Sequence, residues 1–225
     1  MDTQSVGRNQ WRSEGRLLIP TNGLIFYAPL WDAGLSGDPF NALNIANGGV
    51  HSCDVNAATW GGQGRTFDGT DDYIDGGSPI VPANDFTMVL WAKKASLSTA
   101  YYVASQWKAG TDNRMTLIFI GDNTFGYTQT LGGTVATNAV DTNFHHFAIA
   151  RDAGAIIITV DGNIEGTGTI ATTVEQGANF LIGTYNIAVG SNDFAGTVGE
   201  FLIYNRALLV GEIQQHYLAT KWRYQ

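Results

Sequence analysis

The sequence predicts an all-β protein, a sandwich or barrel of antiparallel strands with one short helix near its C-terminus. Three observations lead to this class. Gly supplies 28 of the 225 residues, well above the average share of roughly 7%. Aromatic residues make up 12% of the chain and charged residues only 14%. Short apolar runs separated by turn residues recur along the chain, without the strand and helix alternation of a parallel sheet.

The first strands are predicted where apolar runs end at a proline or at glycines. Leu24–Ala28 stops at a proline, and Asp72–Asp75 is followed by two glycines. Residues 32–64 lie between them and are rich in Gly, Asn, Asp and Ala, so we expect a loop there with no more than one short strand. The run 86–92 is apolar at odd and even positions alike, which predicts a strand buried on both faces.

Further strands are expected in the second half of the chain. The clearest hairpin joins residues 144–151 to 155–160 through a turn at Asp152, Ala153 and Gly154. Leu209, Ile213 and Tyr217 follow a helical period and predict the short helix. No second core is visible in this pattern, so we expect one domain. The remaining strands are predicted at residues 101–107, 115–120, 124–129, 180–183 and 198–204.

Residues 1–20 are predicted to form an N-terminal arm, and residues 21–225 the domain. The arm carries three arginines against Asp2 and Glu14, whereas the whole chain has a formal net charge of −8. A basic arm can dock on a neighbouring subunit of an assembly, and a frayed terminus is the alternative. The residues expected to make the docking contact are Trp11, Arg12, Arg16, Leu17, Leu18 and Ile19.

Charge and hydropathy argue against several classes of partner. A surface with a net charge of −8 repels phosphates, so we expect no nucleic acid partner. No window of about 18 apolar residues exists, which argues against membrane insertion. The N-terminal segment lacks the apolar region of a secretory signal peptide. Cys53 is the one cysteine, so an internal disulfide is excluded.

Four segments, in order, resemble the laminin-G-like branch of the concanavalin-A-like lectin and glucanase superfamily. The resemblance implies a two-sheet antiparallel jelly-roll sandwich and extends over residues 23–218. It does not by itself fix a function, because one fold hosts many activities. The segments are Arg65–Ile74, Phe86–Lys93, Phe144–Ala148 with Val160–Gly162, and a last one that runs from Leu181-Ile182-Gly183 through Phe194-Ala195-Gly196 and Ile203–Leu208 to Glu212-Ile213.

The densest acidic cluster contains the candidate metal ligands, Asp71 and Asp72, with Asp68 and Asp75 beside them. Calcium binds six to eight oxygen atoms, and the resemblance implies such an ion near the loop rim. However, Gly199 stands where members of the family commonly carry an Asp. Turn chemistry, in which Asp side chains bond the backbone, is the favoured explanation of the cluster. We expect no required cofactor, with calcium as the open alternative.

Catalysis has little support in the sequence. A glycosidase needs two carboxyl groups that flank the sugar bond, yet Glu200 has no carboxylate two residues away on either side. His145 and His146 are neighbours on a predicted strand, so they point to opposite faces and do not easily share a metal. No nucleotide-binding loop or nucleophile motif is present. We therefore expect a non-catalytic protein, with glycoside hydrolysis as the weakest alternative.

Recognition of a partner is the remaining class. Aromatic rings offer rigid contact surface, and loop amides and carboxylates bond sugar hydroxyls. The first hypothesis is a structural or adhesive subunit of a homo-oligomeric assembly, a bacteriophage-type virion surface or tail protein, located on the virion or outside cells. The second is a soluble lectin-like glycan-binding module with optional calcium. Core packing is the alternative at each aromatic among the candidate ligand-binding residues, Trp107, Tyr127, Tyr185, Asn186, Asn192 and Asp193.

Overall fold

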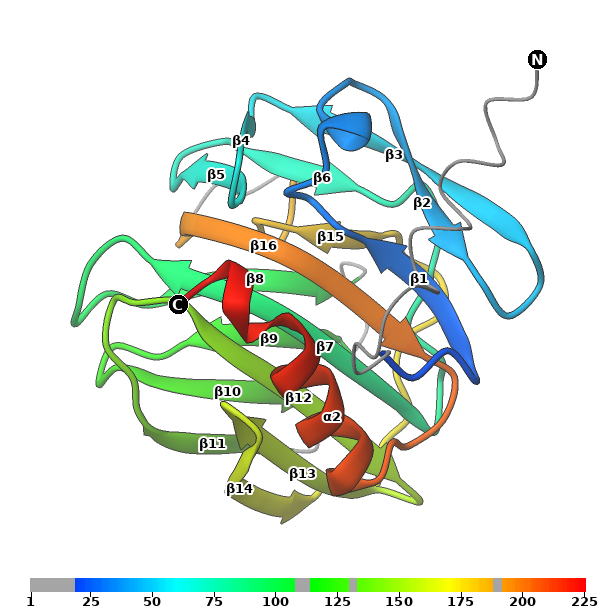
Figure 1. The fold of residues 1–225 in the computed structure, drawn as a ribbon. Coiled ribbons are helices and arrows are strands. Elements are labelled where there is room, and N and C mark those ends of the chain that lie inside the picture. The colour runs from blue at the N-terminus through cyan, green and yellow to red at the C-terminus, as the bar shows by residue number, and fades with distance from the viewer. Residues whose placement is uncertain (1–18, 108–113, 130–132, 188–191) are drawn as a thin grey trace.

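The computed structural model describes residues 19–107, 114–129, 133–187 and 192–225, and it is an all-β fold with one short C-terminal helix (Figure 1). The helix is α2 (Val210–Thr220), and short 3-10 turns are η1 (Ala33–Leu35) and η2 (Lys221–Arg223). The strands are β1 (Leu24–Ala28), β2 (Phe40–Asn44), β3 (Gly49–Asn56), β4 (Thr59–Gly61), β5 (Gly64–Asp68), β6 (Tyr73–Asp75), β7 (Phe86–Lys94), β8 (Tyr101–Gln106), β9 (Met115–Phe119), β10 (Thr124–Gln129), β11 (Gly133–Ala139), β12 (His145–Asp152), β13 (Ala155–Val160), β14 (Asn163–Thr169), β15 (Phe180–Ile182) and β16 (Ala195–Tyr204).

These strands pair into one antiparallel sheet that curls around the core as a nearly closed, barrel-like layer. The order is β11-β10-β9-β8-β15-β6-β3-β2-β1-β16-β7-β12-β13-β14, with β5 on β16 and β4 on β5. β3 pairs with both β2 and β6, so it connects the two halves of the layer. The prediction of an all-β antiparallel fold is therefore confirmed, whereas its division into two separate jelly-roll sheets is not.

Glycines allow the two ends of this sheet to approach each other. A Cβ atom on Gly166, in β14, would lie 2.6 Å from the backbone oxygen of Ala136, in β11. A Cβ atom on Gly168 would lie 2.5 Å from the side chain of Val135. Neither distance is tolerated by a real side chain, so β14 can lie against β11 only because both positions are glycine. The close approach covers two strand edges that would otherwise face solvent.

β7 is buried on both faces, as its continuous apolar sequence predicts. Met88 and Leu90 point into the main core between the two halves of the sheet. Val89 points the other way, into a second apolar cluster that includes Ile213 of α2. Trp91 shares this outer face, where its ring stacks on Tyr224 with centroids 4.6 Å apart. α2 and the turn after it thus form a cover over β7, β12 and β16 (Figure 1).

The segment predicted as a loop at 32–64 contains three strands, so that prediction was wrong. Its apolar side chains are few but correctly spaced: Phe40 and Ala42 are buried on β2, and Cys53 is buried on β3. Asn41, Ser52 and Asp54, which alternate with them, are exposed, and this is the alternation of a strand with one solvated face. The predicted turn between β12 and β13 is present, with Ala153 and Gly154 at φ values of 47° and 89°.

The predicted N-terminal arm lies almost wholly outside the described residues, including Trp11, Arg12, Arg16, Leu17 and Leu18. Ile19 is described, and it packs against the apolar cluster beneath α2. Beside it, the Tyr204 hydroxyl donates a hydrogen bond to the backbone oxygen of Pro20 at 2.9 Å. The start of the described chain is therefore fastened to the same face as α2.

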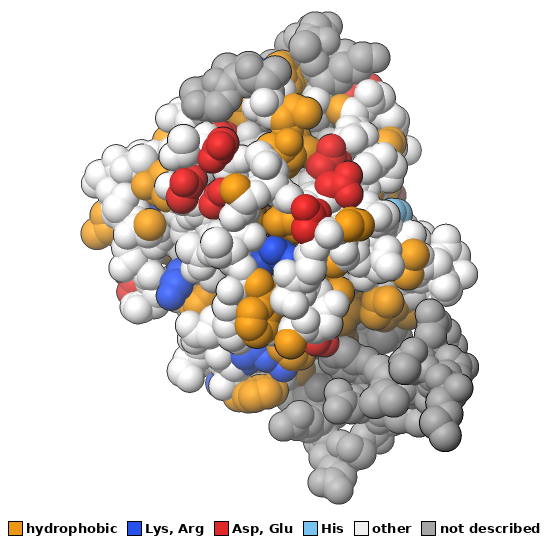
Figure 2. Space-filling model, turned by 90° about the horizontal axis from the view of Figure 1, so that it is seen from above, with side chains coloured by type: hydrophobic (Ala, Val, Ile, Leu, Met, Phe, Trp, Pro, Cys, Tyr) orange, Lys and Arg blue, Asp and Glu red, His pale blue; other side chains and the backbone are white. Residues whose placement is uncertain are grey.

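Figure 2 shows several carboxylates close together on one face of the molecule. This arrangement agrees with the excess of Asp and Glu over Lys and Arg in the sequence. In the described part of the chain, no helix has the length and apolar character needed to cross a bilayer.

Candidate ligand-binding groove

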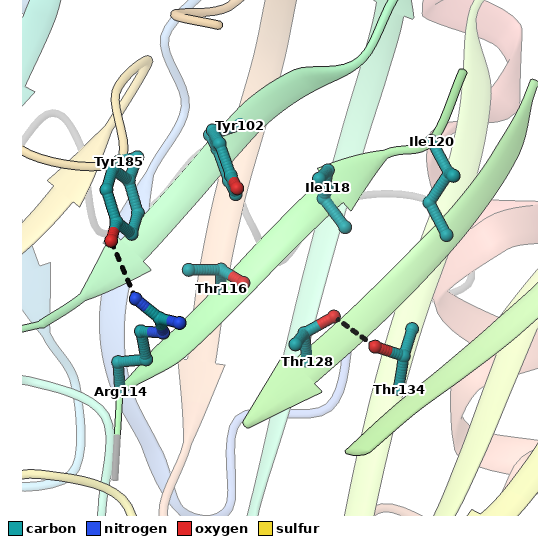
Figure 3. Close-up of a pocket in the computed structure, with 8 residues that line it drawn as sticks. All are labelled: Tyr102, Arg114, Thr116, Ile118, Ile120, Thr128, Thr134 and Tyr185. Carbon is teal, nitrogen blue, oxygen red and sulfur yellow. Dashed lines mark hydrogen bonds between the residues drawn. The ribbon is translucent and has the colours of Figure 1, made fainter. Parts of the chain in front are cut away.

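A groove of about 290 Å³ runs across the outer face of the sheet at β8, β9, β10 and β11. Successive side chains of a strand point to opposite faces of the sheet, and this alternation decides which residues line the groove. On β9, Met115, Leu117 and Phe119 point into the core, so Thr116 and Ile118 point outward into the groove. The described lining residues, drawn in Figure 3, are Tyr102, Arg114, Thr116, Ile118, Ile120, Thr128, Thr134 and Tyr185.

A stack of three aromatic rings stands at one end of the groove. The Tyr185 ring lies 4.8 Å from the Tyr102 ring and 4.7 Å from the Trp107 ring, with interplanar angles of 28° and 21°. All three side chains are partly exposed. Trp107 and Tyr185 were predicted from the sequence as ligand contacts, and the structure brings them together. Tyr102 was not predicted, although its position on an outward parity of β8 could have indicated it.

Arg114 stands beside this stack. One of its Nη1 N–H groups donates a hydrogen bond to the Tyr185 hydroxyl at 2.7 Å, and its guanidinium carbon lies 5.7 Å from the centre of the Tyr185 ring. Figure 3 shows the side chain rising from the start of β9 toward the phenol. A guanidinium has five N–H donors and no acceptor. Among the described residues, Arg114 therefore has N–H donors that bond no other group, and it stands at the aromatic end of the groove.

Hydroxyl groups line the opposite end. Thr128 on β10 and Thr134 on β11 share a hydrogen bond of 2.9 Å between their hydroxyls (Figure 3). Thr116 lies at the buried floor, and Ile118 and Ile120 form an apolar strip beside it. Among the described lining residues, none is Asp, Glu or His. The groove thus offers hydroxyls, a phenol, a guanidinium and apolar surface, which are groups that can orient a ligand by hydrogen bonds and apolar contact.

Tyr127 lies in the core, which corrects its predicted place beside the ligand. Its side chain is 0% exposed and packs against Phe86 with ring centroids 6.0 Å apart. The reason is parity: Phe125, Tyr127 and Gln129 alternate inward along β10, and Thr128 takes the outward position. Desolvation by burial raises the pKa of Tyr127. Proximity to a polar loop in the sequence did not reveal which face the ring occupies.

The other predicted ligand residues gather around the aromatic stack. The Asn192 backbone oxygen accepts a hydrogen bond from the Tyr102 N–H at 2.9 Å, and Asn186 donates its N–H to the Thr184 hydroxyl. Asp193 is 4% exposed and accepts a 2.6 Å hydrogen bond from that hydroxyl. Burial raises the pKa of Asp193. Its carboxylate therefore fastens the segment that carries Tyr185, and it is not an open ligand contact.

The predicted acidic cluster also forms, with carboxylate oxygens of Asp68, Asp71 and Asp72 within 4.8 Å of one another. Two of these groups bond the backbone, because Asp72 accepts the N–H of Asp68 and Asp68 accepts that of Thr70, both at 2.8 Å. Burial raises the pKa of Asp72. These bonds are the turn chemistry that the sequence offered as the alternative to a metal.

The calcium position implied by the family resemblance does not fit this chain at Gly199. A Cβ atom there would lie 2.3 Å from the Tyr224 ring, so this position has no room for an Asp side chain. None of the three clustered carboxylates lines the groove.

A second hollow, of about 550 Å³, opens near the C-terminal turn and contains His145. Its ring nitrogens lie 2.8 Å from Asp161 and 3.0 Å from Asp141. The hydrogen bond to Asp161 is the main cause that raises the pKa of His145. Its neighbour His146 points to the other face, as predicted, and is fully buried. Both nitrogens of His145 are already engaged, so this hollow offers no free base.

Comparison with known proteins supports the same fold. A Trypanosoma rangeli sialidase in complex with 2,3-difluorosialic acid has a TM-score of 0.70 and 17% identity; the match covers 92% of this chain and 34% of the sialidase chain. Domain 4 of AbnA, a GH43 extracellular arabinanase from Geobacillus stearothermophilus in complex with arabinotriose, has a TM-score of 0.65 and 17% identity, covering 88% of this chain and 98% of that domain. The receptor binding domain of botulinum neurotoxin D has a TM-score of 0.64 and 10% identity, covering 88% and 52%.

At these identities the structural similarity shows the fold alone, and this chain spans about a third of the sialidase's own length. A search of curated protein sequences found no match. A sequence profile described as the concanavalin A-like lectin/glucanases superfamily, of laminin-G type, matches residues 68–214. Because this profile covers more than half of the chain, the protein belongs to the concanavalin A-like lectin/glucanases superfamily.

Proposed function

We propose that this chain is a non-catalytic glycan-recognition module that binds sugars in the groove on β8–β11. The observation that carries the proposal is the lining of that groove: partly exposed Tyr102 and Tyr185, the guanidinium of Arg114 and a row of threonine hydroxyls. Aromatic faces pack against the C–H faces of sugar rings and offer a polar rim. Hydroxyls and a guanidinium supply the hydrogen bonds that orient such a ligand.

Two similar structures support the proposal through the ligands with which they were solved. The sialidase was solved with a sialic acid analogue and the arabinanase domain with arabinotriose. Both ligands are sugars, and the match with the arabinanase domain covers 98% of that domain and 88% of this chain. The described lining of the groove holds no pair of carboxylates, which favours recognition over glycoside hydrolysis. Glu200, the glutamate singled out in the sequence, is buried beneath α2 and is not part of the groove.

A glycan array with the purified chain tests the proposal, followed by titration of the best ligand against variants. Tyr102→Ala removes an aromatic wall and is expected to weaken binding about tenfold or more, as loss of an aromatic anchor does. Trp60→Ala is the matched control, because Trp60 is an exposed aromatic on β4 outside the groove. Absence of any array binding, or equal binding by the wild type and Tyr102→Ala, would contradict the proposal.

No metal is needed in this proposal, since the acidic cluster stands outside the groove and Gly199 supplies no ligand. A chelator is therefore expected to leave glycan binding unchanged.

We also propose that the curled sheet is a jelly roll with two facing layers. Aromatic rings that meet across the core support this topology, such as Phe125 on β10 and Phe147 on β12, whose centroids lie 4.1 Å apart. The predicted virion role, location and homo-oligomeric partners stay predictions, and mass photometry of the purified chain is their first test.

A further inference from the structure

The arginines of this chain differ in how their guanidinium groups are satisfied. Arg65 is buried and donates to the backbone oxygens of Leu35, Gly37 and Ala58. Arg151 is buried as well and donates to three backbone oxygens in the same manner. Such bonds offset the cost of removing a charged group from water. Both side chains thus have structural roles that leave little capacity for a ligand.

Arg114 lacks this arrangement. Within the described residues, its guanidinium has one hydrogen bond, to the Tyr185 hydroxyl, and no ion pair with a carboxylate. It is half-buried, and it faces a groove whose described lining contains no acidic side chain. A planar guanidinium with free N–H groups is matched best by a carboxylate, which accepts two parallel hydrogen bonds from it.

We propose that the groove selects sugars that carry a carboxylate, and that Arg114 is the residue that determines this specificity. This inference rests on the proposed glycan-binding function of the same groove. The carboxylate would accept from those N–H groups of Arg114 that bond no described residue. The Tyr185 hydroxyl, which already accepts from Arg114, retains its own proton to donate to the same group. The sugar ring would then extend over Thr116 toward Thr128 and Thr134, whose hydroxyls suit the neutral part of the ligand.

The stack of Tyr185 with Tyr102 and Trp107 supports this role, because it fixes the phenol that positions Arg114. A side chain held in place before the ligand arrives loses less conformational entropy on binding. The net charge of −8 does not favour an acidic ligand at long range. Selectivity must therefore come from a short-range contact within the groove, which a guanidinium supplies and a general surface potential does not.

Two matched pairs of probes test the inference: trigalacturonic acid against its methyl ester, and 3′-sialyllactose against lactose. Each pair shares a neutral part and differs in a carboxylate-bearing group. In at least one pair we expect the acid to bind about tenfold or more tightly, as for a hydrogen bond to a charged group. Arg114→Gln should abolish that preference, so that the acid and its neutral partner bind with equal affinity, and Arg114→Lys should retain only part of it.

Lys221→Gln is the control for charge, because it removes one positive charge from η2, outside the groove. It should keep the full preference for the acid. Equal affinity for acid and neutral partner, or a preference that survives Arg114→Gln, would overturn the inference while glycan binding by the groove still stands. Absence of binding by any probe or array glycan overturns the proposed function and this inference together. Melting temperatures of the variants, expected near the wild-type value, show that each one folds.

Discussion

The Oε1 atom of Glu200, on β16, lies 3.8 Å from the Nε2 atom of His216, on α2, and both side chains are at least 99% buried. This distance is too long for a hydrogen bond, and neither atom has another hydrogen-bond partner in the described part of the chain. Trp31 donates its indole N–H to the other Glu200 oxygen at 3.4 Å. Burial raises the pKa of Glu200 to about 7 and lowers that of His216 to about 3. We therefore expect the stability of the fold to depend on the protonation of Glu200.

Glu200→Gln is expected to flatten the dependence of stability on pH. A carboxyl with a raised pKa in the folded protein binds its proton more tightly when folded, so its contribution to the free energy of unfolding falls as pH rises from 4.5 through about 7. At about 1.4 kcal/mol per pKa unit, the loss is on the order of 3 kcal/mol. Urea unfolding between pH 5 and pH 8 measures it. Equal pH slopes for the wild type and the variant would show that Glu200 does not titrate in this range.

His145→Gln is expected to cost more stability in mildly acidic than in alkaline solution. The carboxylates of Asp161 and Asp141 raise the pKa of His145 above its ordinary value of 6.5. The charged ring thus stabilises the fold fully below pH 6.5, and this contribution is lost as pH rises through the folded-state pKa. We expect a difference of about 1 kcal/mol, because the site is partly solvated. Chemical denaturation at pH 6 and pH 9 checks it, and a cost that grew with pH would contradict it.

The two ends of the sheet show why parts of the fold escaped prediction. β1, β7 and β13 lie where their apolar runs predict them. Each of these strands is largely buried, so its sequence contains a run of apolar residues that can be recognised. β11 and β14 were missed because their sequences, Gly133–Ala139 and Asn163–Thr169, are polar and rich in small residues. Gly166 and Gly168 of β14 allow a contact with a distant segment, β11, and no local sequence pattern indicates such a contact.

The groove was also predicted only in part, because local sequence features indicate some of its residues and strand pairing alone brings the others together. Trp107 and Tyr185 were identified because rigid aromatics stand beside polar loops in the sequence, and they do stack on each other. The prediction that Tyr127 contacts the ligand was wrong, because its position along β10 and not its closeness to a loop decides which face of the sheet the side chain occupies. Arg114 and Tyr102 lie 12 positions apart in the sequence, and only the pairing of β8 with β9 brings them to one site.

Tyr127→Phe is expected to leave stability unchanged or raise it by about 1 kcal/mol. The Tyr127 hydroxyl is buried and has no hydrogen-bond partner among the described residues, and an unsatisfied buried polar group carries a desolvation cost. Tyr127→Ala, in contrast, should destabilise by roughly 3–5 kcal/mol through the cavity that it leaves. Urea denaturation of both variants measures the effects. If Tyr127→Ala reduced stability only slightly and abolished glycan binding, Tyr127 would be an exposed ligand contact and not a core residue.

A pair of glycine substitutions tests how the sheet closes. Gly166→Ala places a Cβ atom 2.6 Å from the Ala136 backbone oxygen, so it should push β14 from β11 and destabilise by roughly 1–3 kcal/mol. Gly211→Ala is the matched control: Gly211 lies in the first turn of α2 with nothing within 4 Å of an added Cβ atom. There Ala should stabilise by about 0.5 kcal/mol, because Gly loses more backbone entropy in a helix. If Gly166→Ala were as harmless as Gly211→Ala, β11 and β14 would not be in contact, and the sheet would be open at that edge.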